Sequence, residues 1–173
     1  QTVRVGKFHF VLLASKKYIA RHGLPLSEAD LNGHHFADVL PNMRSERGYL
    51  QALAGLEAAG SVLFSTNSSL AAANAVEAGV AMAALPSYIY LTSEEFVPVL
   101  PATQVYEMGI YLNFSVAAAA RPEVRALIDF LKGVVLSKRH PWFADSFEPI
   151  SADWRSTHQN YLEAGRLGTL VSS

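Results

Sequence analysis

The most informative hydrophobic pattern lies at residues 61–89, where two short apolar runs flank a run of small residues. Residues 61–65 are too few for a helix and are rich in strand formers. Residues 70–78 predict an alanine-rich helix that ends at Gly79, and residues 80–85 predict a second strand. A strand, a helix and a strand of this length predict a βαβ unit with two parallel strands.

Small polar residues stand where each of these two strands ends. The candidate ligand-binding residues are Thr66, Asn67, Ser68 and Ser69 after the first strand, and Pro86 and Ser87 after the second. The carboxyl ends of parallel strands share one edge of a sheet, so we expect the two groups to lie side by side. Ligands of such units bind beyond this edge, where the next helix offers unpaired N–H groups and its positive dipole end.

Other interpretations of these residues stay open. Capping of the helix alone needs one of the four residues 66–69, so capping explains part of the pattern. Tyr88 fits a pocket wall, although an ordinary half-buried aromatic is the favoured interpretation. Arg44 and Arg47, in a predicted loop at 41–48, could pair with an anionic ligand, but solvated loop charges are more common.

The rest of the chain alternates predicted strands and helices. Strands are predicted at 8–14, 35–40, 96–100 and 109–115. Helices are predicted at Lys16–His22, at one turn after Ser27, at 49–59, and at 122–135, where a single apolar stripe runs along the helix. Pro98 restricts its strand to an edge of the sheet or a bulge. Beyond Lys138 the composition changes, and we expect a loosely attached tail.

Composition and charge narrow the class of protein. The chain has 173 residues, of which 50% are hydrophobic and 17% charged, as expected of one globular domain or two small lobes. The net charge of −1 creates no general field that attracts nucleic acid or an acidic membrane. The absence of cysteine excludes disulfides and thiolate sites. No run approaches the apolar length of a membrane helix.

The residues do not predict a metal, a cofactor or a catalytic residue. His34 and His35 are neighbours on a predicted strand, so they point to opposite faces, and the other histidines are scattered along the sequence. Ser68 or Ser69 as a nucleophile would need a histidine and an acid, and no Gly-x-Ser-x-Gly motif is present. Glycines occur singly, so no phosphate-binding loop is predicted.

The first residue is Gln1, and the strand pattern begins almost at once. We therefore expect the chain to start partway through a larger protein.

Several stretches, taken in order, resemble the effector-binding domain of LysR-type transcriptional regulators. They are LLASKKYIARHGLP with LSEADLNGHHF, SVLFSTNSSLAAANAVEAGVAMAALPSYI, FVPVL and RPEVRALIDFLKGVV. Together they cover about residues 8–136, and the later PWFADSF resembles the tail of one subset of the family. The resemblance implies an α/β fold of the type II periplasmic-binding-protein class, with a small-molecule cleft between two lobes.

The chain departs from the family at its start, where a winged helix-turn-helix, a linker and the first βαβ unit of lobe one are missing. The resemblance then implies one complete lobe plus remnants of the other. Residues 1–12 would be a remnant of lobe one and 13–108 the effector-binding lobe two. Residues 109–150 would return to lobe one with a C-terminal helix, and 151–173 would form a tail.

The function implied by this resemblance is small-molecule sensing and dimerisation without catalysis, in the cytoplasm. The effector would be anionic and would bind at the six candidate residues. DNA would be bound only through the missing N-terminal domain, and neither a membrane nor a cofactor is expected. The alternative is a solute-binding protein of the same fold that serves a transporter.

Overall fold

We describe the protein from a computed structural model, which covers residues 1–39, 55, 58, 60–91, 93–100, 106–136 and 143–144. The predicted loop 41–48, nearly all of the predicted helix 49–59, and the tail 151–173 lie outside the described residues.

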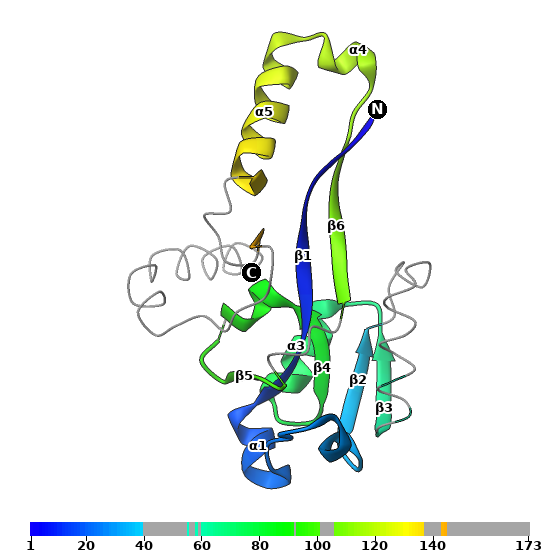
Figure 1. Ribbon diagram of the computed structural model, residues 1–173, viewed down its shortest axis with the longest axis vertical. Helices are drawn as coiled ribbons and strands as arrows, with labels where there is room; N and C mark the ends of the chain where they lie inside the picture. The colour runs from blue at the N-terminus through cyan, green and yellow to red at the C-terminus, as the bar shows by residue number, and fades with distance from the viewer. Residues whose placement is uncertain are drawn as a thin grey trace, which may run out of the picture.

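The described part of the chain alternates strands and helices (Figure 1). The strands are β1 (Thr2–Ser15), β2 (His35–Val39), β3 (Ser61–Thr66), β4 (Met82–Pro86), β5 (Phe96–Pro98) and β6 (Tyr106–Asn113). The helices are α1 (Lys16–His22), η1 (Glu28–Leu31), α3 (Ser69–Glu77), η2 (Ser87–Leu91), α4 (Val116–Ala119) and α5 (Pro122–Leu136), where η marks 3-10 helices. The mixed α/β class predicted from the sequence is confirmed.

The strands form one sheet in the order β3-β2-β4-β1-β5, with β6 also paired to β1. Strand β2 is parallel to both β3 and β4, so β3 and β4 run in the same direction as predicted. The expectation that these two strands lie side by side is wrong, because β2 is inserted between them. Helix α3 therefore crosses over β2 on its way from one strand to the other.

Strand β1 is the element with the most pairing partners. At Phe10 it pairs with Pro86 of β4 on one edge and with Tyr106 of β6 on the other. From Phe10 it continues into a fully buried run, while toward Thr2 it leaves the sheet with β6 as a two-stranded ribbon (Figure 1). The early start of β1 agrees with the strand pattern that begins almost at once in the sequence. Strand β6 begins three residues before the predicted 109–115, because backbone pairing with β1 holds residues whose side chains are only half-buried.

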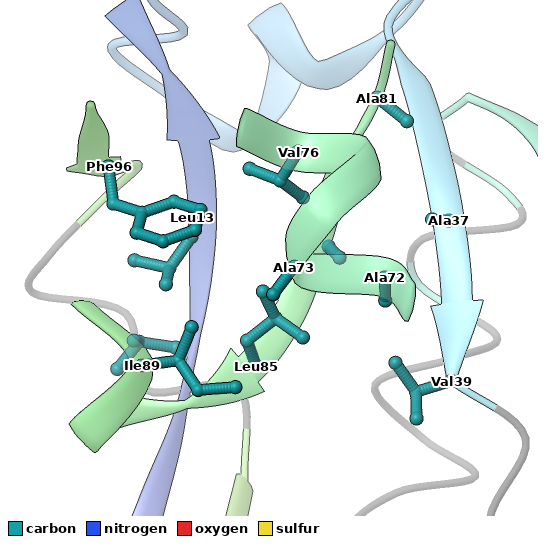
Figure 2. Packing of buried hydrophobic residues seen from close by; sticks show 12 residues of the cluster. Leu13, Ala37, Val39, Ala72, Ala73, Val76, Ala81, Leu85, Ile89 and Phe96 are labelled. Atoms are coloured by element: carbon teal, nitrogen blue, oxygen red, sulfur yellow. The ribbon is translucent and has the colours of Figure 1, made fainter. Parts of the chain in front are cut away.

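One hydrophobic core cluster lies between the sheet and α3 (Figure 2), and a second one includes Tyr18 of α1, Leu31 of η1 and Phe36 of β2. Ala72, Ala73 and Val76 of α3 are buried against the sheet, and Ala72 and Val76 are fully covered. In Figure 2 Ala72 and Ala73 lie beside Val39 and Leu85, near the carboxyl ends of β2 and β4. Methyl side chains allow the helix axis to come close to the strands, so the amino end of α3 is held at this edge of the sheet.

Local signals explain how the short helices begin and end. Ser15 caps α1, since its hydroxyl accepts the N–H of Tyr18, and Gly23 with a φ of 84° follows the helix. Ser27 and Asp30 form a capping box at η1. The starts of α1 and η1 and the end of α1 agree with the sequence prediction.

Helix α5 packs on the ribbon by a narrow contact. A side-chain carbon added at Gly6 of β1 would overlap a methyl group of Val135, so glycine is required for this approach. Only Ile128 of the helix is buried. The large apolar side chains Leu127, Phe130, Leu131 and Leu136 are exposed. The alanine-rich stretch before α5, for which no helix was predicted, forms the short helix α4, and Ser115 is its N-cap.

Residues 143–144 lie against the ribbon. Nε2 of His9, whose side chain is fully buried, donates to the carbonyl oxygen of Ala144 across 2.8 Å. This bond ties a residue of the predicted tail region to β1, so that part of the tail is attached.

The close approach of α3 gives a direct test. Replacing Ala72 by Leu should lower the free energy of unfolding by about 1–3 kcal/mol, because no space exists between α3 and β2 for a larger side chain. The same change at the exposed neighbour Ala71 should alter it by less than about 0.5 kcal/mol. Urea unfolding of both variants measures the difference, and equal losses would contradict the packing described.

Candidate functional site

The six candidate residues lie at one edge of the parallel part of the sheet. Thr66 ends β3 and Pro86 ends β4, while the intervening β2 ends at Val39. Because all three strands run in the same direction, their carboxyl ends point to the same side. The structure thus brings residues 66–69 and residues 86–87 to a common edge of the sheet. Because β2 lies between them, the candidate site spans the ends of three strands.

Two of the four candidate residues 66–69 stabilise the local backbone with their hydroxyl groups. The hydroxyl of Thr66 accepts the N–H of Ser68 at 3.1 Å, and the hydroxyl of Ser68 accepts the N–H of Ala71 at 3.2 Å. Ser68 is therefore the N-cap of α3, with extended backbone angles. For these two hydroxyls, the capping interpretation explains the residues.

The other two residues keep free polar groups. Within the described residues, the side chains of Asn67 and Ser69 make no hydrogen bond, and Asn67 is exposed. The backbone N–H groups of Ser69 and Leu70 have no acceptor there either, as expected for the first turn of a helix. This end of α3 therefore presents two N–H donors, an amide and a hydroxyl together with the positive end of the helix dipole.

Ser87 is the most unusual of the candidates. Its side chain is 2% exposed, yet its hydroxyl has no hydrogen-bond partner among the described residues. A buried hydroxyl without a partner costs about 1–3 kcal/mol, so such a group is expected to have a use. Its place directly after β4 puts it at the same edge as the start of α3.

Tyr88 fits the packing interpretation that the sequence favoured. Its ring makes an edge contact with Phe8 of the ribbon, with centroids 6.0 Å apart, while 44% of the residue stays exposed. Burial of the hydroxyl raises the pKa of Tyr88 above its ordinary value. Arg44 and Arg47 lie outside the described residues.

Ser68 and Ser69 are the serines at the start of α3. His34 and His35 stand at the opposite, amino end of β2. The buried His9 directly precedes Phe10, which pairs with Pro86 at the end of β4. Ser68 and Ser69 make no hydrogen bond to any histidine within the described part of the chain. A serine nucleophile needs a base within hydrogen-bond reach, which neither serine has there.

Histidines gather at the other end of β2, which the sequence analysis missed. His22, which is separate from His34 and His35 in the sequence, lies beside Tyr18 and near His35, and His34 also lies beside Tyr18. The available signal was the spacing of Tyr18 and His22, four residues apart on one helix face. No group of three His, Cys, Asp or Glu residues suited to a metal ion occurs in the described ranges.

Capping and ligand binding can be separated by substitution at residues 66–69. Ser68→Ala should lower the free energy of unfolding by about 1 kcal/mol, because the N–H of Ala71 loses its acceptor. Asn67→Ala should change it by less than about 0.5 kcal/mol, because the amide makes no bond. Chemical denaturation measures both. A large loss for Asn67→Ala would show that its amide is structural.

None of the helices in the described part of the chain has the length and hydrophobicity that a bilayer crossing requires. A comparison with curated proteins gives no match.

Solved structures with a similar fold include regulatory domains of LysR-type regulators. The regulatory domain of CrgA, a LysR-type transcriptional regulator from Neisseria meningitidis, is 20% identical with a TM-score of 0.59, over 76% of this chain and 67% of that one. The C-terminal domains of a LysR family protein from Agrobacterium tumefaciens are 21% identical with a TM-score of 0.57, over 79% and 67%. Full-length AphB, the virulence activator of Vibrio cholerae, is 18% identical with a TM-score of 0.57, over 78% and 47%.

The sequence profile of the LysR substrate binding domain matches residues 1–136, most of the chain. The chain spans about two thirds of the regulatory-domain structures and about half of the full-length ones. The resemblance noted in the sequence is confirmed, and the chain belongs to the LysR substrate-binding domain family.

Proposed function

We propose that this chain is the small-molecule-sensing and dimerising part of a LysR-type transcriptional regulator. The observation that carries the proposal is the family match over residues 1–136, together with the shared fold of the regulatory domains. These matches favour the regulator over a solute-binding protein that serves a transporter. The regulator would act in the cytoplasm, where promoter DNA is found, and would bind DNA through an N-terminal domain.

The effector site proposed is the edge formed by Thr66, Asn67, Ser68 and Ser69 with Pro86 and Ser87. Its working groups are the free N–H groups at the start of α3, the Asn67 amide and the buried Ser87 hydroxyl. All of these can donate hydrogen bonds, and the helix dipole adds a positive potential. An anionic effector, such as a carboxylate, is the ligand that this set of donors would favour.

Sensing needs no chemistry beyond differential binding. An effector changes the population of two arrangements only if it binds one of them better. We propose that residues 13–108 form the effector-binding lobe and that residues 1–12 and 109–150 belong to a second lobe. The β1–β6 ribbon would then connect the two lobes, so a ligand at the end of β4 lies close to that connection. The match to the LysR substrate binding domain supports a non-enzymatic role.

The backbone N–H of Ser69 can be removed selectively. Ser68 has φ −116° and ψ 113°, which suits a residue before proline, and Ser69 is the first helical residue, where proline is tolerated. Ser69→Pro therefore removes one N–H and the hydroxyl with little disturbance of α3, and Ser69→Ala removes the hydroxyl alone. The pair isolates the contribution of the backbone donor.

These variants test the site in the full-length regulator. The probes are matched pairs of small carboxylates and primary amides with the same skeleton, and the readout is the free energy of unfolding. A carboxylate at 100 times its dissociation constant should stabilise the protein by about 2.7 kcal/mol. Ser69→Pro should lose most of this gain and Ser69→Ala should keep most of it. Equal gains in both variants and in the unchanged protein would contradict an anion site at α3.

Dimerisation is proposed through the exposed apolar side of α5. Phe130 is 65% exposed and Leu127 55% exposed, and exposed apolar patches tend to find a partner. Sedimentation velocity should show a dimer for the full-length protein and a shift toward monomer for Phe130→Ser. A matched change at the exposed Asp129, Asp129→Ser, should leave the dimer intact. An unchanged dimer in Phe130→Ser would place the interface elsewhere.

A further inference from the structure

Three of the chain's six histidines meet around one buried tyrosine, at the end of β2 away from the proposed effector site. The ring of His22 stacks on Tyr18 with centroids 4.4 Å apart, and the ring of His34 lies 5.7 Å from that of Tyr18. His22 is 5.8 Å from His35 and 6.5 Å from His34, measured between ring centroids. The cluster joins α1 to the start of β2.

The Tyr18 hydroxyl contacts both His34 and His35. Its oxygen accepts the backbone N–H of His35 at 2.9 Å. The same hydroxyl lies 3.1 Å from Nδ1 of His34. When Nδ1 is unprotonated, it can accept the hydrogen of the Tyr18 hydroxyl. A proton at Nδ1 removes this acceptor for the Tyr18 hydrogen.

The surroundings of the cluster make a positive charge on His34 unfavourable. Tyr18 is fully buried and His34 is 8% exposed, so a charge there loses most of its hydration. The groups that act on His34 are His22 of α1 and His35 at the start of β2, which repel a positive charge, and Asp30 of η1, which attracts it. Burial, followed by the two histidines, lowers the pKa of His34 below 6.5.

The Asp30 carboxylate already accepts hydrogen bonds at the start of η1. Its Oδ2 accepts the backbone N–H groups of Leu26 and Ser27 at 3.0 and 2.9 Å, and these bonds with the Ser27 hydroxyl lower its pKa. The carboxylate therefore stays at the η1 cap and offers only a distant attraction to His34. The nearby Nδ1 of His35 is buried and, among the described residues, has no hydrogen-bond partner.

We propose that Tyr18, His22, His34 and His35 form a pH-sensitive latch, in which protonation of His34 removes the acceptor of the Tyr18 hydroxyl hydrogen and releases α1 from the start of β2. The latch is closed when His34 is neutral and opens in acid. It is a property of the fold, separate from effector binding, because the cluster lies at the opposite end of β2 from the α3 start.

The direction of the pH effect follows from linkage. His34 binds a proton less readily in the folded chain than in the unfolded chain, so the unfolded chain carries more protons below pH 6.5. The stabilisation is complete above that pH and is lost as the pH falls through 6.5 toward the lower pKa of the folded state. Between pH 7.5 and 5.5, the folding equilibrium constant should fall by up to about tenfold from this one residue.

The test compares the unchanged chain with His34→Asn in denaturant unfolding at pH 7.5 and pH 5.5. The Asn side-chain oxygen can accept the Tyr18 hydroxyl hydrogen in place of Nδ1 but cannot be protonated in this range. The variant should stay folded, and its folding equilibrium constant should lose the part of the decrease between pH 7.5 and 5.5 that is due to His34. The matched control is His9→Gln, which changes another buried histidine while keeping a donor for the Ala144 carbonyl. The His9→Gln variant should keep the decrease in the folding equilibrium constant that is due to His34.

A second measurement keeps the proposal falsifiable if His34→Asn does not fold. In NMR spectra of the unchanged chain, the His34 ring signal should titrate below pH 6.5, and the His35 amide should lose protection from hydrogen exchange in the same pH range. Equal pH dependence in the unchanged chain and His34→Asn would overturn the latch. So would a His34 titration at or above 6.5, or loss of the decrease in His9→Gln alone.

Discussion

The close contact between α3 and the sheet is the constraint from which the rest of the structure follows. Alanine methyl groups at 72 and 73 let the helix lie over β2 and β4, and Val76 is fully buried beside them. Burying such a valine contributes roughly 1.5–3 kcal/mol, which holds the helix in one position. Because that position is fixed, the free N–H groups at the start of α3 are presented at the strand ends, where the proposed site is.

Much of the fold could be predicted from local signals. The caps Ser15, Ser27 and Ser68 and the punctuating Gly23 and Gly79 determine where helices begin and end, and each acts within a few residues. Pro98, predicted for an edge or bulge, stands in the edge strand β5. Strand order was not predictable in this way. That β2 lies between β3 and β4 depends on which apolar faces pack best across the whole sheet, and no short pattern contains that information.

The site was predictable in its residues but only partly in its arrangement. Polar residues at the ends of strands 61–66 and 82–86 indicated the edge. Two other features arise from tertiary packing: the end of β2 at Val39 lies between those strands, and the Ser87 hydroxyl has no hydrogen-bond partner among the described residues. The histidine cluster shows the same limit. Gly23 and Gly33 adopt positive φ and turn the chain back after α1 and η1, which brings His34 to Tyr18 across sixteen positions of sequence.

The central position of β1 has a consequence for synthesis of the protein on the ribosome. This strand is made before its partners β4, β5 and β6, which span residues 82–113, and the Gln1 carbonyl oxygen accepts the N–H of Phe114. At about 5–20 residues per second, the apolar run of β1 waits roughly 5–20 seconds for those partners. During that interval it is an unpaired strand with two open edges, the kind of segment that aggregates unless a chaperone holds it. The yield of folded protein is thus expected to depend on translation speed over that stretch.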